Sequence, residues 1–491
     1  MQVYDEKVAI VNSFGTSYNI IHGTIMGKSN QIEMTKGPLL GKIILFALPL
    51  IASGSLQLLY NAADLIIVGQ FASNGQKALA AVGATNAIIN LIINVVIGLS
   101  VGASVVVARY LGAEDRDGAH RATHTSITVS LISGLVVGLF GFFSARWLLT
   151  MMNTPEDGVV LNMAVMYMKI YFIGAPMNML YNFGSAVLRA MGDTKRPLYF
   201  LTIAGVANII FNFIFVYFLH LDVEGVAIAT LISQTISAIL VTVCLCKTDG
   251  PCKLRFKNLR IYGKEMKMIA VVGLPAGIQG SLFSISNVII QSSMNTFGDI
   301  VMSGNTAAVN IEGFVYVAEN AFYHAAITFT GQNYGARQYK RTRKVFWITM
   351  ALTAVVGIVL SALICILGRP LLSIYLPGEE EAISYGMTRI FIVMIPYFTL
   401  GLVNTVVGQL RGLGYSLSPM IISVFGICGI RIIWVYTAFQ ANRTLEMLYT
   451  SYPISWIVTL IGTLVVYLIA VRRLPKDGEL PPLKPKAGAK Q

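Results

Sequence analysis

The sequence predicts an all-α integral membrane protein with twelve transmembrane helices in two pseudo-symmetric lobes of six helices each. Composition is the first reason: 55% of the 491 residues are hydrophobic and only 12% are charged, whereas a soluble chain carries about 25% charged residues. The second reason is a series of twelve apolar stretches, and the third is a repeat that relates the first six stretches to the last six. Together these observations place the chain in a lipid bilayer.

Each apolar stretch is long enough to cross a bilayer, which takes about 20 residues of helix. Inside hydrocarbon a single segment satisfies its own backbone hydrogen bonds only as a helix, so each stretch is expected to be helical. The twelve expected spans are residues 43–69, 79–107, 122–145, 161–187, 198–219, 225–246, 268–294, 305–330, 345–368, 382–409, 420–439 and 448–471.

Positive charges fall on alternate connections between the spans. If both termini lie in the cytoplasm, 29 of the 36 Lys and Arg residues lie on the cytoplasmic side, four lie outside and three lie within spans. This imbalance follows the positive-inside rule and predicts a multi-pass protein of the plasma (inner) membrane with both termini cytoplasmic. It also explains the net charge of +13 without nucleic acid as a partner, because the charges are spread over membrane loops.

The spans divide the chain into five expected parts. These are a cytoplasmic N-terminal tail at 1–41, an N-lobe at 42–246, a basic cytoplasmic linker at 247–267, a C-lobe at 268–471 and a disordered cytoplasmic tail at 472–491. The first tail has no signal-peptide core, and Met26 and Met34 are alternative start sites to Met1. The second tail is rich in Pro, Lys and Gly, a composition that cannot bury a core.

The five cysteines are expected to be free thiols in a reducing compartment. Three of them, Cys244, Cys246 and Cys252, lie close together in the sequence, a spacing that can indicate a metal site. No histidine lies near them, so we expect no metal site.

Five short sequence matches recur in the second half of the chain, at offsets between 222 and 227 residues. In one of them, Pro49 precedes a Gly-Ser-Leu segment in the same way as Pro275 does. In another, Leu-Arg-Ala-Met-Gly at 188–192 matches Leu-Arg-Gly-Leu-Gly at 410–414. Each copy holds six spans, so both copies have the same orientation and are expected to be related by an axis along the membrane normal. Two such lobes with a cleft between them suit alternating access.

A charge within a span needs a physical reason, because it costs about 2.5–3.5 kcal/mol on insertion scales. Asp64 is such a charge, and it lies near the outer end of the first span. At about 1.5 Å of rise per residue, neutral polar side chains from three spans share its layer in the N-lobe: Gln57, Tyr60, Asn208, Asn212 and Thr230. A carboxylate among neutral oxygens suits a buried cation or proton site, because burial favours the protonated acid.

Two structural alternatives remain for this layer. Asp64 can instead form a fixed ion pair with Lys169 of the fourth span, which would matter only for assembly. The neutral residues Asn208, Asn212 and Thr230 can serve only as interhelical hydrogen-bonding groups, which are common in membranes.

The C-lobe has its own layer of embedded charge. Glu312, Arg389 and Arg431 lie at similar depths in the eighth, tenth and eleventh spans, and two arginines near one glutamate favour a structural cluster over a substrate site. Glu319 lies deeper, on roughly the same helix face as Glu312. We expect Glu319 either to pair with His324 or to face the cleft, where an anionic side chain would suit a cationic substrate.

Prolines are expected to interrupt four spans, because proline removes a backbone hydrogen bond and kinks a helix. They are Pro49, Pro176, Pro275 and Pro396, in the first, fourth, seventh and tenth spans. Pro49 precedes Asp64 on the same span, so it is a candidate hinge that bends when Asp64 changes protonation. A static kink is the alternative.

Several of these motifs together resemble the MATE (multidrug and toxic compound extrusion) family over residues 36–471. The resemblance rests on Pro49 and on five segments: Asp-Leu-Ile-Ile-Val-Gly at 64–69, Ala-Leu-Ala-Ala-Val-Gly at 78–83, Leu-Arg-Ala-Met-Gly-Asp-Thr-Lys-Arg-Pro at 188–197, Gly-Val-Ala-Ile-Ala-Thr at 225–230 and Gly-Gln-Asn-Tyr-Gly-Ala at 331–336. It implies a V-shaped pair of lobes that exports substrates in exchange for H⁺ or Na⁺. It also implies that Asp64 is the family's functional aspartate, with polar positions of the family at Gln57, Tyr60, Asn208 and Thr230.

The chain departs from the family pattern in two places. Asn212 stands where many bacterial members carry an aspartate, four residues after the asparagine at Asn208. The missing charge weakens the case for Na⁺, a hard cation that favours charged oxygens. The acidic residues that some members carry on the seventh and tenth spans are also absent here, and Glu312 is the candidate to replace them.

These observations predict a secondary antiporter that exports organic, cationic amphipathic compounds in exchange for H⁺ rather than Na⁺. We expect a monomer that binds a small organic molecule and no cofactor beyond the coupling ion.

One alternative is a flippase for lipid-linked oligosaccharides, but a flippase needs a strongly basic cavity, and the few embedded cations here are expected to be paired. A membrane-embedded enzyme is a further alternative, but the spans contain neither a His/Glu metal motif nor a Gly-x-Ser-x-Gly turn. A channel or receptor is disfavoured by the twofold repeat.

Overall fold

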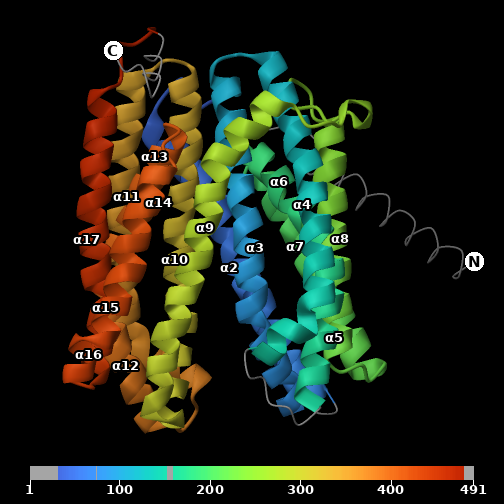
Figure 1. Ribbon diagram of the computed structural model, residues 1–491, viewed down its shortest axis with the longest axis vertical. Helices are drawn as coiled ribbons and strands as arrows, with labels where there is room; N and C mark the ends of the chain where they lie inside the picture. Colours follow the sequence, from blue (N-terminus) through green and yellow to red (C-terminus); the bar gives the residue numbers. More distant parts are fainter. Residues whose placement is uncertain (1–30, 73–74, 152–158, 480–491) are drawn as a thin grey trace, which may run out of the picture.

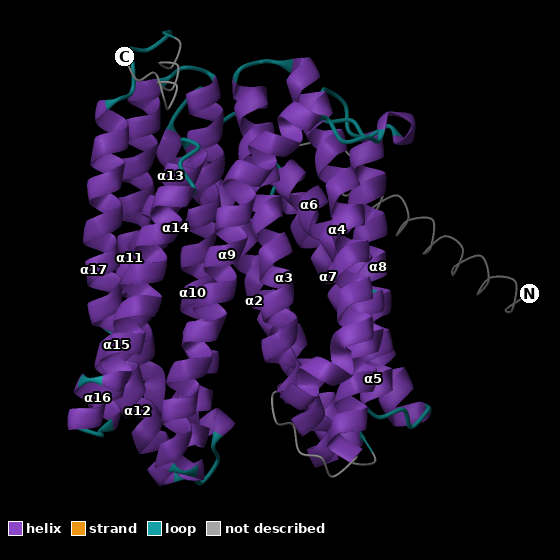
Figure 2. Cartoon of the chain, viewed as in Figure 1, coloured by secondary structure: helices purple, strands orange, loops and turns teal. Residues whose placement is uncertain are grey.

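The computed structural model describes residues 31–72, 75–151 and 159–479, and this part of the chain is helical with short connections (Figures 1 and 2). The N-lobe is built from α2 (Leu39–Phe71), α3 (Gly75–Gly112), α4 (Arg116–Met151), α5 (Val159–Ile173), α6 (Ala175–Ala190), α7 (Lys195–Asn212), the π-helical turn η1 (Phe213–Phe218) and α8 (Val223–Lys247).

The second half of the chain repeats this order. The connecting segment holds one 3₁₀ turn, η2 (Phe256–Asn258). The C-lobe then contains α9 (Gly263–Met294), the 3₁₀ turn η3 (Asn295–Phe297), α10 (Asp299–Gly335), α11 (Tyr339–Tyr375), α12 (Glu380–Met394), α13 (Phe398–Gly412), α14 (Leu417–Ser423), the π-helical turn η4 (Val424–Gly429), α15 (Ile430–Tyr436), α16 (Ala438–Ala441) and α17 (Leu445–Arg472).

The helices account for twelve spans. By length and composition, nine segments of the described chain can cross a membrane, and two bent pairs, α5 with α6 and α12 with α13, raise the number to eleven. The twelfth span is α10, whose 37 residues include Glu312 and Glu319. It packs against α2, α3, α11, α12 and α13, so its polar side chains meet protein rather than lipid. The prediction of twelve helices in two lobes is confirmed.

The internal repeat is visible in the shape of the two bent spans. The fourth span bends by 47° between α5 and α6, beside Pro176, and the tenth span bends by 45° between α12 and α13, beside Pro396. Two of the four expected interruptions are therefore present. The other two predicted interruptions are wrong, because α2 and α9 each continue as one helix through Pro49 and Pro275. Proline removes one hydrogen bond, and packing on both sides of the residue decides whether the helix also breaks.

The ends of the two bent spans are alike as well. The second residue after the helix is glycine in each case, Gly192 with φ +88° and Gly414 with φ +83°. The next N–H group then bonds back to the helix, from Asp193 to the Leu188 carbonyl and from Tyr415 to the Leu410 carbonyl. This is a helix C-terminus that requires the left-handed conformation, which glycine adopts without strain.

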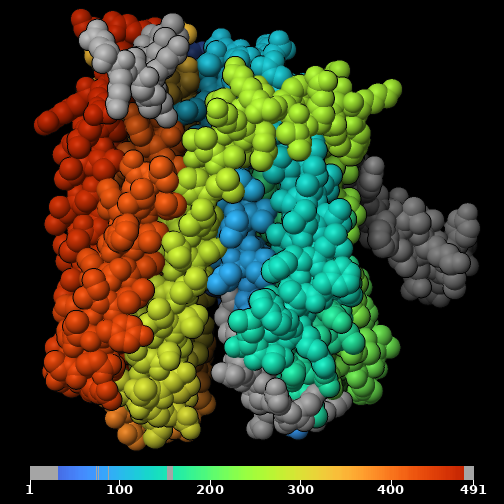
Figure 3. Space-filling model, viewed as in Figure 1, coloured from blue at the N-terminus to red at the C-terminus, as the bar shows by residue number. Residues whose placement is uncertain are grey.

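The two lobes meet along the halves of α3 and α9 that lie nearest the basic loops (Figure 1). At Gly98 and Gly102 of α3, an added Cβ would come within 2.1 Å of the Gly277 nitrogen and 2.3 Å of the Ile269 carbonyl oxygen of α9. The helices can approach this closely only because small residues line the contact. Towards the opposite end the lobes separate, and the space-filling view shows a hollow between them (Figure 3). By the positive-inside prediction, the open end is the outer one.

α2 and α9 each pass from one lobe to the other. Before Pro49, Leu39 and Phe46 of α2 pack in one core with Phe322 and Val345 of the C-lobe. Further along, Gly54 of α2 still lies against Val317 of α10, and Tyr60 then lies against Gly205 of the N-lobe. Pro49 therefore lies in the part of α2 that packs on the C-lobe, ahead of the part that packs on the N-lobe.

α9 makes the opposite crossing. Its first turn is tied to the N-lobe by an ion pair of 2.8 Å between Arg121 and the buried Glu265. Its later residues Ile290 and Met294 belong to the core of the C-lobe. α9 begins at Gly263, so the connection between the lobes is 248–262, shorter than the expected linker 247–267.

Two stretches expected to be tails are partly folded onto the protein. At the N-terminal side, Met34 is fully buried and its carbonyl accepts hydrogen bonds from Arg341 and Asn333. At the C-terminal side, the Asp477 carboxylate accepts a bond from the Lys340 backbone, and the Glu479 carbonyl accepts one from the Tyr339 hydroxyl. The expected disorder of the C-terminal tail is therefore wrong for residues 472–479. The start sites Met1 and Met26, and the tail residues 1–30 and 480–491, lie outside the described residues.

Candidate functional site

A polar cavity of about 170 Å³ lies inside the N-lobe, between α2, α6, α7 and α8. Five of the six residues predicted for the cation or proton site line it. The sixth, Asn212, is hydrogen-bonded to Asp64. The cavity is lined by Gln57, Tyr60, Asn61, Asp64, Asn178, Tyr181, Asn182, Leu201, Ala204, Gly205, Asn208, Thr230, Ser233, Gln234 and Ser237. The depth estimate from the sequence thus brought together side chains from three separate spans.

Asp64 is held by a short chain of amides from α7. The Asn212 side-chain N–H donates to the Asp64 carboxylate at 2.5 Å and to the Asn208 side-chain oxygen at 3.3 Å. Asn208 and Asn212 are four residues apart, so they occupy one face of α7, and both are buried. The amide fixes the Asp64 carboxylate and stabilises its ionised form.

The surroundings of Asp64 are otherwise uncharged. Lys169 does not reach it: its ammonium lies over the ring of Phe142, 5.2 Å from the centroid, and no ion pair of Asp64 is seen within the described chain. The structural alternative of a fixed Asp64–Lys169 pair is therefore wrong. Asp64 is therefore a partly buried carboxylate that lines a cavity of neutral polar groups and accepts one amide hydrogen bond.

Two buried oxygen atoms close to Asp64 have no hydrogen-bond partner among the described residues: Asn212 Oδ1 and Thr230 Oγ1. Buried polar groups are almost always satisfied. These two atoms can accept or donate a bond when Asp64 is protonated or when a ligand enters.

The sequence predicted five of the fifteen residues that line this cavity and missed the other ten. Asn178 and Asn182 bond to each other on α6 at 2.6 Å, just after the bend at Pro176. On α8, Thr230 was recognised but Ser233, Gln234 and Ser237 were not. The signal was available, because polar residues at i, i+3, i+4 and i+7 form one stripe on an otherwise apolar helix.

A second cavity, of about 440 Å³, lies inside the C-lobe. It contains Glu312 of α10, Arg389 of α12 and Arg431 of α15, which the sequence placed at one depth. Glu312 and Arg389 form a buried bidentate ion pair with N–O distances of 2.7 and 2.9 Å. Arg389 also donates to Asn305 at 3.0 Å. Of the three residues that the sequence placed in one cluster, Glu312 and Arg389 therefore contact each other directly.

Arg431 departs from that expectation, because it is not paired with the glutamate. Its guanidinium donates to the Ser455 hydroxyl at 3.2 Å and to the Asn287 side-chain oxygen at 3.1 Å, both neutral groups. The described residues give it no acidic partner within ion-pair distance. The expectation that the embedded cations are paired is thus wrong for Arg431 and for Lys169.

Glu319 neither pairs with His324 nor faces the cleft. Its side chain is fully buried against Gly357 and Gly401, where an added Cβ would lie 2.8 and 2.5 Å from the carboxyl group. Neither of its oxygens has a hydrogen-bond partner in the described chain. An ionised carboxylate without a partner is costly in such a place, and the side chain fills a gap between α10, α11 and α13.

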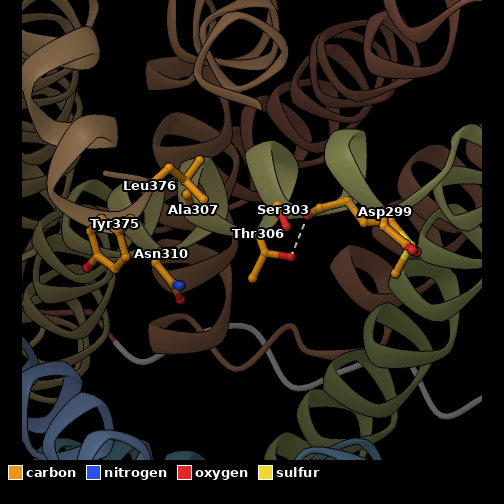
Figure 4. A pocket seen from close by; sticks show the side chains of 8 residues that line it. Asp299, Ser303, Thr306, Ala307, Asn310, Tyr375 and Leu376 are labelled. Carbon is orange, nitrogen blue, oxygen red and sulfur yellow. Dashed lines mark hydrogen bonds between the residues drawn. The ribbon is translucent and has the colours of Figure 1, made fainter. Parts of the chain in front are cut away.

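A third hollow lies where α10 begins and α11 ends (Figure 4). Ser303, Thr306 and Asn310 of α10 line it together with Tyr375, and Asp299 lies at its edge. Asp299 is exposed, and the hollow holds no buried charge. It therefore lacks the desolvated groups that mark the two deeper cavities.

The structure offers no obvious place for a metal. Within residues 31–72, 75–151 and 159–479, no group of three His, Cys, Asp or Glu side chains could hold a metal ion, and all five cysteines are unpaired.

Comparisons with known proteins agree with this architecture. The family model MatE matches residues 49–214 and 275–437, one match in each lobe. Among curated relatives, the probable multidrug resistance protein YoeA of Bacillus subtilis is 27% identical over 85% of this chain and 91% of its own length. The probable multidrug resistance protein YpnP of the same organism is 26% identical over 81% of this chain and 88% of its own length.

Among solved structures, a MOP superfamily transporter from Pyrococcus furiosus superposes with a TM-score of 0.84. The match covers 91% of this chain and 99% of the other at 22% identity, which establishes the shared fold. That protein is described as having a binding pocket of reverse polarity, which suggests a different function for it.

Proposed function

Because the chain belongs to the MatE family, whose matched relatives are transporters, we propose that it exports organic compounds in exchange for protons. In this proposal Asp64 carries the exchanged proton. The observation that supports it most is the contact between Asp64 and Asn212 in a buried cavity without a countercharge. Such a carboxylate gains or loses a proton at modest cost, because its two forms are closely balanced.

The same contact favours H⁺ over Na⁺ as the coupling ion. A bound metal cation needs several oxygen atoms directed at it. Here Oδ1 of Asp64 already accepts a hydrogen bond from the Asn212 N–H, which occupies an oxygen that a cation would need. The other lining groups are neutral amides and hydroxyls.

We propose amphipathic organic substrates, with organic cations bound at the N-lobe cavity. Asp64 is the acidic residue of that cavity, and Tyr60 and Tyr181 provide aromatic surface beside it, which can stack on a cation. The support expected from Glu319 is lost, because that side chain is buried away from the cleft.

The proposed cycle uses the hollow between the lobes. With the outer end open, a proton from outside neutralises Asp64, which weakens its hold on a bound cation and on Asn212. The substrate then leaves outward. Pro49 is the proposed hinge, since it lies inside α2 between the segment packed on the C-lobe and the segment that carries Tyr60 and Asp64 into the N-lobe.

The experiment is ethidium transport by the purified protein in proteoliposomes, first under an imposed pH gradient and then under a Na⁺ gradient. We expect transport under the pH gradient alone and at least tenfold slower transport by Asp64→Asn. The matched control is Asp117→Asn, the same acid-to-amide change at an exposed position of α4, which should transport normally. Transport driven only by Na⁺, or full transport by Asp64→Asn, would contradict the proposal.

A further inference from the structure

The C-lobe cavity contains more positive than negative charge. Its lining includes two arginines and one glutamate. Both oxygens of Glu312 are bound by Arg389, so this glutamate is not available to a second cation. Arg431, with only 5% of its surface exposed, therefore gives this buried cavity a net positive charge.

The bonds of Arg431 hold its side chain in place without neutralising it. Nε donates to Ser455 of α17 and Nη1 donates to Asn287 of α9, which fixes the plane of the guanidinium. Nη2 makes no hydrogen bond to any described residue, and Arg431 lines the cavity. A buried guanidinium without a countercharge is costly unless an anion joins it, and its planar array of N–H groups fits a carboxylate or phosphate.

Aromatic side chains surround this charge. The guanidinium carbon of Arg431 lies 4.2 Å from the ring centroid of Tyr452 and 5.9 Å from that of Trp456. Tyr316 and Tyr397 line the same cavity. These rings offer flat apolar surface next to the cation, which suits a ligand with an aromatic body and an acid group.

The cavity is also placed for transport. It includes Asn94 of α3, which bonds to Ser284 of α9 at 3.2 Å, so its lining extends to the boundary between the lobes. Its volume of about 440 Å³ lies in the usual range for small-molecule sites.

We propose that the C-lobe cavity is a substrate subsite for aromatic organic acids, with Arg431 binding the carboxylate or phosphate group. This inference rests on the proposed function, because it names a class of compound that the exporter carries. It widens that class from cations, bound near Asp64, to compounds whose acid group lies in the C-lobe.

The test is equilibrium binding of two dyes that differ in one group, measured by fluorescence polarisation in lipid nanodiscs, with empty nanodiscs subtracted. Rhodamine 110 carries a free carboxylate, and rhodamine 123 is its methyl ester. We expect the wild-type protein to bind rhodamine 110 about tenfold more tightly, the scale of a hydrogen bond to a charged group. Arg431→Gln should abolish this preference, and Arg431→Lys, which keeps the charge, should retain much of it.

The matched control is Lys169→Gln, which removes an embedded cation of the N-lobe whose ammonium lies over the Phe142 ring. Lys169 does not line the C-lobe cavity, so the dye preference of this variant should equal that of the wild type. Equal binding of both dyes by the wild type would overturn the proposal without any variant. An unchanged preference in Arg431→Gln would also overturn it. The measurement uses no gradient, so a failure of proton coupling leaves its result interpretable.

Discussion

At the scale of single residues, the proposed function depends on how Asp64 is balanced between its charged and neutral forms. Burial disfavours the carboxylate, and the N–H group of Asn212 stabilises it at 2.5 Å. Removing either influence should move the pH at which the site exchanges its proton.

Asn212→Leu tests this balance, because leucine has a similar volume and no hydrogen-bond donor. The Asp64 anion loses its bond, so deprotonation should require a higher pH, and the pH profile of substrate export should move upward by about one unit, the equivalent of about 1.4 kcal/mol. The measurement is the initial rate of ethidium transport against pH. The control is Asn182→Leu in the same cavity, whose amide bonds to Asn178. An unmoved profile in Asn212→Leu would show that the amide does not set the balance.

The sequence could predict which polar residues of the N-lobe come together, because depth along each span follows directly from the helical rise. It could not predict that Lys169 turns toward Phe142 or that Arg431 bonds to neutral groups. Depth fixes the layer of a side chain, but the rotation of each helix and the direction of each long side chain depend on tertiary packing.

At the scale of elements, α2 and α9 connect the lobes, and their prolines lie within continuous helices. Sequence reasoning expected four interrupted spans, and the structure has two. The proline signal was the same in all four, so the difference comes from the packing of α2 and α9 against both lobes.

Pro49→Ala tests whether this position is a hinge. Alanine restores a backbone N–H that can bond to the carbonyl one turn earlier, which stiffens α2. We expect ethidium binding close to wild type but several-fold slower transport under a pH gradient. Pro453→Ala in α17, also a proline inside an intact helix, is the control and should transport normally. Normal transport by Pro49→Ala would show that Pro49 is not a hinge.

The glycine contact between α3 and α9 gives a second prediction for elements. Gly102→Ala would place a Cβ within 2.3 Å of the Ile269 carbonyl oxygen, so the helices must separate, at a cost of about 1–3 kcal/mol. Hydrogen exchange at residues 263–277 should become faster. Gly83→Ala, on the same helix with nothing within 4 Å of the added Cβ, should exchange as the wild type does. Unchanged exchange in Gly102→Ala would contradict the tight contact.

At the scale of the whole molecule, the two lobes are in contact near the basic loops and apart at the opposite end (Figures 1 and 3). The repeat was readable in the sequence because both copies retain short motifs, and the paired bends and glycine caps follow from it. The lobe crossings of α2 and α9 were not readable, since they depend on contacts between residues far apart in the chain.

The membrane orientation can be tested directly. Green fluorescent protein, which becomes fluorescent only when it folds in the cytoplasm, should be fluorescent when fused after residue 491. Alkaline phosphatase, which is active only outside, should be active when inserted in the 219–222 connection, at the end where the lobes separate. The opposite pair of results would show that the predicted orientation is reversed and that the open end faces the cytoplasm.

Asp64 is proposed to exchange a proton for substrate, and proton release on substrate binding measures this exchange most directly. Purified protein in weakly buffered detergent solution near pH 7 is mixed with ethidium in the presence of a pH indicator. The wild type should release up to about one proton per ethidium bound, according to the fraction of Asp64 that is protonated beforehand. Asp64→Asn should release none, while Asp117→Asn should match the wild type. Equal proton release by Asp64→Asn and wild type would contradict the claim.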